Sequence, residues 1–175
     1  ASDVYKRQVY VNGKKAGENH YGYTSFSFDI SKYLVCDGLT ENVIAVKAVN
    51  KIPSSRWYSG SGIYRDVKLI VTDQVHVSPN GTQITTPDIE NGTGTVSAKV
   101  NVTNSGTSAT NITVRNTVYG KNDQAVSKPA ETSLTIAAGA SADASINNVV
   151  SNPVLWSLDD PTQYYVRTEI LSAGS

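Results

Sequence analysis

Apolar and polar residues alternate along most of this 175-residue chain, and a two-residue period predicts strands. The clearest case is the segment 95–102, in which Val96, Ala98, Val100 and Val102 fall on one face. The segment 43–49 is apolar at nearly every position, which predicts a strand buried on much of both faces. Other segments with the alternating period are 26–30, 63–72, 111–119 and 164–171.

Turn residues separate these segments. Asn12-Gly13 follows the apolar residues 9–11 and predicts a two-residue hairpin turn, because both positions tolerate positive φ. Residues 80–82 predict a second turn, and residues 30–34 predict a short helical turn. Segments with a helical period are scarce, so the sequence predicts an all-β protein.

The pattern changes at Asp73-Gln74, where one apolar run ends and another begins. We therefore expect one domain over residues 1–73 and a second over residues 74–175. About seven short strands over the last ~100 residues predict an immunoglobulin-like β-sandwich. Its core should be aliphatic, with Trp156 as a large anchor. Residues 1–8 are largely polar and resemble translated sequencing adapter, so we expect them to be non-native.

The composition narrows the functional classes. The chain has 15 basic and 15 acidic residues, so no net charge attracts it to nucleic acid or to an anionic membrane. No apolar run approaches the ~20 residues that a spanning helix requires. The single cysteine, Cys36, excludes an internal disulfide and any cysteine-rich metal site, and we expect it to be a packed or turn thiol. We expect neither a cofactor nor a metal ion.

The sequence contains no recognisable set of catalytic residues. Catalysis by a pair of acidic groups needs the two carboxyl groups held close together, and no arrangement of acidic residues in this sequence demands such a pair. Asp159 and Asp160 are neighbours in a turn, where adjacent side chains diverge. His20 and His76 have no serine or cysteine motif beside them. We therefore expect no catalytic residue in this chain.

The segment 56–67 combines aromatic residues, glycines and an Arg-Asp pair between a polar loop and an apolar run. The glycines let the backbone turn where a side chain would clash. Arg65 and Asp66 are most simply a structural ion pair or hydrogen-bonded pair at a strand start. Trp57 and Tyr58 suit either a sugar-stacking platform or a plug between two sandwiches. The residues to which we assign a structural role are Gly60, Gly62, Tyr64, Arg65, Asp66 and Trp156.

This segment resembles the end of the sugar-binding domain of glycoside hydrolase family 2, which includes β-galactosidases, β-glucuronidases and β-mannosidases. Val11-Asn12-Gly13 with Gly17, and the segment 22–30, match the same domain. Residues 85–87 and 152–157, with Pro161, Tyr164 and Tyr165, match the family's immunoglobulin-like domain. The resemblance implies the C-terminal part of a galactose-binding-like jelly roll, followed by an immunoglobulin-like sandwich.

In the family, both catalytic carboxylates come from a barrel domain that this sequence does not contain. The resemblance thus implies a non-catalytic fragment of a β-galactosidase-like enzyme, inactive alone, that scaffolds the barrel during hydrolysis of O-glycosyl bonds. The loop before the motif approaches the active-site mouth in family members. That places Asn50, Ser55, Arg56 and Trp57 near the substrate of the parent, although no acidic residue stands between positions 50 and 58.

Two alternatives remain open: a stand-alone carbohydrate-binding module, and an adhesion or interaction sandwich. The segment 57–67 argues against the adhesion class, because adhesion repeats have no reason to carry it. A jelly roll without its first strands leaves unpaired edges, which invite pairing with another chain. We therefore expect self-association or disorder in residues 1 to about 60, with residues 75–173 folding independently. The resemblance indicates a bacterial source and leaves cytoplasmic and secreted locations open.

Overall fold

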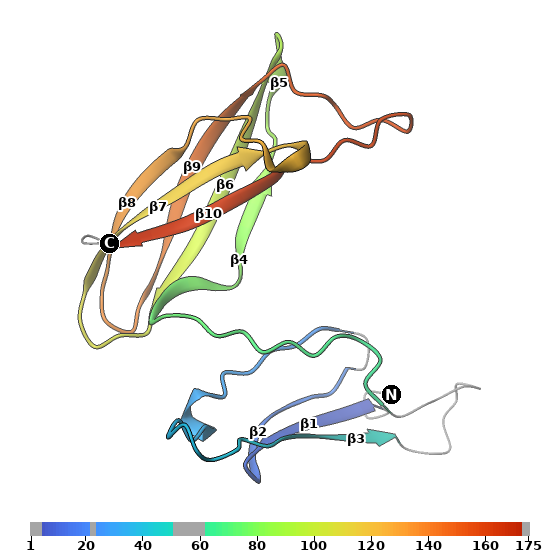
Figure 1. Ribbon diagram of the computed structural model, residues 1–175, viewed down its shortest axis with the longest axis vertical. Coiled ribbons are helices and arrows are strands. Elements are labelled where there is room, and N and C mark those ends of the chain that lie inside the picture. The colour runs from blue at the N-terminus through green and yellow to red at the C-terminus, as the bar shows by residue number, and fades with distance from the viewer. Residues whose placement is uncertain (1–4, 22–23, 51–61, 173–175) are drawn as a thin grey trace. The chain divides into compact units, whose positions relative to one another are not determined.

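The computed structural model describes residues 5–21, 24–50 and 62–172 (Figure 1). The chain divides into two compact units, Ala1–Leu69 and Ile70–Ser175. Both are built from antiparallel strands, and the helical residues in the described ranges are two short 3₁₀ turns, Ser31–Tyr33 and Lys121–Asp123. The all-β fold class predicted from the sequence is confirmed.

The first unit is a three-stranded sheet in the order β2-β1-β3. Its strands are β1 (Tyr5–Val11), β2 (Lys14–Asn19) and β3 (Ile44–Asn50). Asn12 and Gly13 join β1 to β2 with φ values of 49° and 77°, which confirms the predicted hairpin turn. The turn Ser31–Tyr33 confirms the helical turn expected within residues 30–34.

A glycine–phenylalanine contact shapes the segment after β2. A Cβ atom on Gly17 would lie 2.3 Å from the Phe28 ring, so the ring packs directly on the backbone of β2. Residues 24–30 form no strand, so the half-buried strand predicted for 26–30 is wrong. Phe28 is half-buried between exposed neighbours, as a residue of an alternating strand would be. Its ring, however, packs on the backbone at Gly17 of β2, and the segment pairs with no neighbouring strand.

The strand β3 is the second correction in this unit. It exists as predicted, yet Ile44, Ala45 and Ala48 are exposed. Among the described strands, β3 pairs only with β1, so it is an edge strand of this sheet. Residues Tyr5–Gln8 form the first part of β1 and pair with β3, although we expect residues 1–8 to be non-native; that expectation stays a prediction.

The third correction concerns the segment 63–72, for which the sequence predicts a strand. It is extended but unpaired, and every residue in it is exposed, including Val67 and Leu69. Alternation of apolar and polar residues indicates which side chains would share a face of a strand. A strand in a sheet also needs a neighbouring strand to pair with its backbone N–H and C=O groups. No described strand of the chain supplies that partner here.

The second unit is the immunoglobulin-like β-sandwich. One sheet joins β4 (Val75–Thr85), β5 (Ile89–Glu90), β6 (Thr93–Asn104) and β9 (Ser141–Ser151), with β6 pairing to each of the other three. The second sheet has the order β10-β7-β8, from β7 (Thr110–Tyr119), β8 (Ala130–Ile136) and β10 (Tyr165–Ser172). Figure 1 shows the two layers facing one another.

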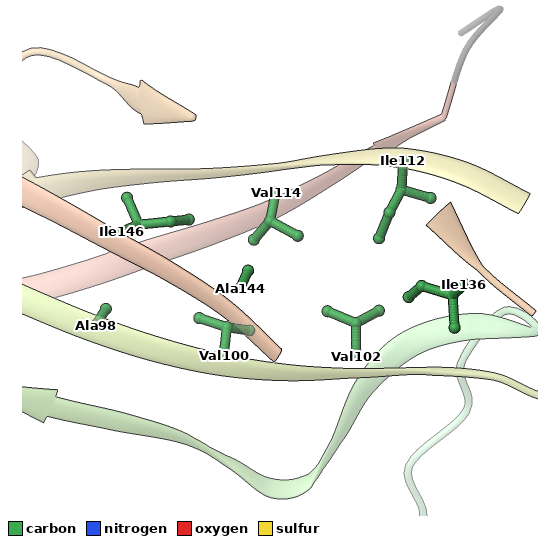
Figure 2. Packing of buried hydrophobic residues seen from close by; sticks show 8 residues of the cluster. All are labelled: Ala98, Val100, Val102, Ile112, Val114, Ile136, Ala144 and Ile146. Atoms are coloured by element: carbon green, nitrogen blue, oxygen red, sulfur yellow. The ribbon is translucent and has the colours of Figure 1, made fainter. Parts of the chain in front are cut away.

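Aliphatic side chains fill the space between the two sheets, as predicted. Figure 2 shows Val100 and Val102 of β6 pointing toward Ile112 and Val114 of β7. Full burial of one such side chain is worth about 1.5–3 kcal/mol, so this cluster is the main source of stability in the unit. The other members of the cluster are Ala98, Ile136, Ala144 and Ile146.

A bulge replaces the turn predicted for residues 80–82. β4 pairs with β6 at Val77 (opposite Val102) and again at Thr82 (opposite Val100), so residues 78–81 form the bulge between the two pairs. A Cβ atom on Gly81 would lie 2.7 Å from the carbonyl oxygen of Ser78 and 2.9 Å from that of Asn101. Only glycine fits there, and the chain continues in the same sheet without reversing.

Asn104 is a buried polar residue that ties the two sheets together at the end of β6. Its side-chain amide donates to the carbonyl oxygens of Ser108 at 2.8 Å and Ile136 at 3.1 Å. Its Oδ1 accepts a hydrogen bond of 2.9 Å from the N–H of Gly106. These bonds join β6 to the loop after it and to the end of β8.

Candidate functional site

Most of the residues predicted to lie near the substrate of the full-length enzyme fall in the range 51–61, which the structure does not describe. Asn50 is the last residue of β3. Ser55, Arg56 and Trp57, and the structural residue Gly60, lie in 51–61, outside the described residues. Their roles therefore stay predictions.

The rest of the motif lies in the exposed, extended segment after residue 61. Gly62 has a φ of 151° and open space where a side chain would stand. Arg65 lies over the ring of Tyr64, with 5.5 Å between the guanidinium carbon and the ring centroid. This cation–π contact is the interaction that the structure shows for Arg65, and the structural pair of Arg65 with Asp66 stays a prediction.

Groups that could carry chemistry are scattered over the surface. In the ranges that the structure describes, no cluster of three His, Cys, Asp or Glu residues could hold a metal ion. Cys36 is exposed, in the region of a turn. Asp160 accepts a hydrogen bond of 2.7 Å from the Thr162 hydroxyl, which fixes the loop locally. Among the described residues, no helix is long and apolar enough to cross a membrane.

The perturbed ionisable groups belong to surface hydrogen bonds. The Thr40 hydroxyl, followed by the N–H groups of Thr40 and Leu39, lowers the pKa of Asp37 to about 2. The hydrogen bond to Asp123 raises the pKa of the Tyr165 hydroxyl. None of these groups faces a second ionisable group in a closed cleft, so these shifts indicate turn and edge stabilisation and not acid–base catalysis.

Two tyrosines form an exposed stack on the outer face of the β10-β7-β8 sheet. The rings of Tyr119 and Tyr165 lie 5.3 Å apart and nearly parallel, at 10°. Arg167 lies over the Tyr119 ring at 4.4 Å. The Tyr119 ring therefore already contacts the Tyr165 ring and the Arg167 guanidinium, which leaves it poorly placed to stack against a sugar.

The second unit contains an apolar pocket of about 310 Å³ that sequence reasoning missed. Val96, Val118 and Val150 contribute to its lining from the strands, and Tyr164 and Trp156 from the loop before β10. Trp156 is 59% exposed, so the prediction that it anchors the core is wrong. It lines an open pocket beside the core instead.

The loop 152–164 is held in place by hydrogen bonds at both ends. Asn152, with a φ of 48°, donates its N–H to the carbonyl oxygen of Gly92 at 2.6 Å. The N–H of Val154 donates to the Tyr164 hydroxyl at 2.8 Å. The sequence signal for this site is the apolar run 154–156 directly after Pro153, because a loop has no core face for such a run.

Fold and site together define a chain of two β-structured modules, with no catalytic constellation among the described residues. The model of the glycosyl hydrolases family 2 sugar-binding domain matches residues 2–73. The model of glycosyl hydrolases family 2 matches residues 75–175. The chain therefore belongs to glycosyl hydrolase family 2, and it corresponds to non-catalytic N-terminal domains of that family.

Individual relatives agree with this assignment. A β-galactosidase of Bacteroides ovatus is 33% identical over 165 residues, which cover 94% of this chain and 19% of that protein. A β-glucuronidase of Bacteroides fragilis is 28% identical over 180 residues, which cover 95% of this chain and 25% of that protein. A solved family 2 structure from Bacteroides cellulosilyticus has a TM-score of 0.88 at 29% identity, covering 99% of this chain and 24% of that one.

The chain thus spans a quarter or less of the length of these relatives. The relatives are multidomain enzymes in which the matching region is joined to a catalytic domain.

Proposed function

We propose that this chain is the scaffold of a β-galactosidase-like glycoside hydrolase and acts only when joined to the catalytic barrel. The observation that carries the proposal is the consecutive match of both non-catalytic family domains across residues 2–73 and 75–175. Hydrolysis of O-glycosyl bonds then belongs to the barrel. The chain holds the barrel and shapes the pocket mouth, with Asn50, Ser55, Arg56 and Trp57 nearest the substrate. We place the domain boundary between residues 73 and 74.

A chimera tests this proposal. This chain replaces the aligned 165 residues of the Bacteroides ovatus β-galactosidase. Isolated chain and chimera are assayed with the p-nitrophenyl β-galactoside and β-glucuronide. We expect no hydrolysis by the isolated chain and hydrolysis by the chimera. Turnover by the isolated chain, or a folded chimera without activity, would contradict the scaffold role.

A stand-alone carbohydrate-binding module is the second candidate function. The family's description of residues 2–73 as a sugar-binding domain favours it. Such a module needs a free aromatic face with polar groups converging beside it. Trp57 is the candidate for that face, because the Tyr119 ring is covered and the pocket beside Trp156 is apolar.

We further propose that the first unit self-associates through the edge of β3. Its exposed Ile44 and Ala45 present an apolar edge, and none of the described strands pairs with β3 on the side away from β1. Sedimentation should show dimers or larger species, and Ile44→Lys should restore the monomer by placing a charge on that edge. A wild-type chain that stays monomeric at its highest soluble concentration would refute this association.

A further inference from the structure

The apolar pocket of the second unit is bordered by an apolar rim that faces solvent. Leu155 and Trp156 lie on this rim and are more than half exposed, and the next apolar residue, Leu158, is 89% exposed. We call the pocket together with Leu155, Trp156 and Leu158 the loop patch. Exposed apolar residues gathered in one place mark interaction surfaces more often than single ones do.

The loop patch is ordered before any partner arrives. The Val154 N–H bonds to Tyr164, and the Ser157 N–H donates to the carbonyl oxygen of Asp160 at 2.9 Å. Asp160 in turn donates its N–H to the Ser157 hydroxyl oxygen at 3.0 Å. A loop held by its own hydrogen bonds loses little conformational entropy when a partner binds, which favours a specific contact.

The lining of the loop patch selects an apolar occupant. Its side-chain hydroxyls belong to threonines and to two tyrosines, and both tyrosine hydroxyls already have a hydrogen-bond partner: the Tyr164 hydroxyl accepts from the Val154 N–H, and the Tyr165 hydroxyl donates to Asp123. A sugar needs several converging donors and acceptors, which this lining does not offer. An aliphatic or aromatic side chain of another protein segment matches it.

We infer that the loop patch is the surface on which the catalytic domain docks, through an apolar side chain inserted beside Trp156. This inference rests on the proposed function and names the surface that performs it. In the Bacteroides ovatus relative, the region aligned with this chain is only 19% of a longer protein, so most of that protein lies outside the aligned region. Domains joined in one chain commonly share interfaces of about 600–1,500 Å², and tryptophan is enriched among the residues that dominate such interfaces.

Thermal unfolding of the chimera and the isolated chain tests the inference. Trp156→Ala and Leu155→Ala are each made in both backgrounds, and calorimetry records the unfolding transitions. Because both side chains are largely exposed in the isolated chain, the substitutions should shift its melting only slightly. In the chimera each should lower the melting temperature by about 5 °C more than in the isolated chain. Leu39→Ala, at a side chain that is 92% exposed in the first unit, is the matched control and should behave alike in both backgrounds.

The outcomes separate the inference from the proposed function. If the wild-type chimera unfolds in one transition but Trp156→Ala shifts both backgrounds equally, scaffolding stands and the loop patch is not the docking surface. If the chimera unfolds as two independent parts, the scaffold proposal itself fails.

A second measurement uses the isolated chain alone. Indole, added as a small apolar probe, should shift the amide resonances of Val96, Val118 and Val150 in a saturable way, and Trp156→Ala should weaken binding. Shifts absent from these residues would overturn the inference even if no folded chimera is obtained.

Discussion

Asn104→Ala tests how the two sheets of the second unit are held together. Asn104 is almost fully buried, and its side chain makes hydrogen bonds of 2.8, 3.1 and 2.9 Å to Ser108, Ile136 and Gly106. Each such bond contributes about 1 kcal/mol net, so their loss should cost about 3 kcal/mol. For a domain of this size, that cost corresponds to a fall in melting temperature of about 12–24 °C.

The assay is thermal unfolding followed by amide resonances of β6 and β7, so that the first unit does not contribute. Asn111→Ala is the matched control: Asn111 is exposed and accepts one hydrogen bond, of 2.7 Å, from Thr135. Its removal should change stability by about 0.5 kcal/mol or less. A fall of less than about 5 °C for Asn104→Ala would refute the claim that this side chain joins the sheets.

Two further predictions concern single residues. Gly81→Ala should destabilise the second unit by about 2 kcal/mol in urea unfolding, because its Cβ would press on the Ser78 and Asn101 carbonyl oxygens; an unchanged midpoint would contradict the bulge geometry. Thr40→Val should raise the pKa of Asp37 from about 2 toward 3.8, measured by a carboxyl NMR titration, since it removes the largest cause of the shift. Because folding lowers this pKa, the carboxylate's stabilising contribution is present above pH 3.8 and is lost as the pH falls toward 2.

The sequence predicted those parts of the fold in which a local pattern is sufficient. Asn12-Gly13 forms its turn because both residues accept positive φ, whatever lies around them. Val100 and Val102 share a buried face because the two-residue period of β6 is regular. Family membership also followed from short motifs, and the family models confirm it.

The failures arise where long-range partners decide the outcome. The segments 26–30 and 63–72 alternate like strands, but neither has a partner strand in the described part of the chain. Trp156 was expected in the core because of its size, yet it lies in the loop between β9 and β10 and is 59% exposed. The apolar run 154–156 is a sequence signal for the loop patch, but the pocket itself could not be predicted, because its lining comes from residues between positions 84 and 166 that meet only in the fold.

The central claim is that this chain supports a catalytic domain and does not bind sugar by itself. The most direct test is a tryptophan-fluorescence titration of the folded chain with galactose, glucuronic acid, mannose and oligosaccharides. Trp57 and Trp156 are the only two reporters, and Trp57→Phe separates their signals. We predict no saturable response to any of these sugars. A saturable change that disappears in Trp57→Phe would contradict the scaffold role and would establish the chain as a carbohydrate-binding module.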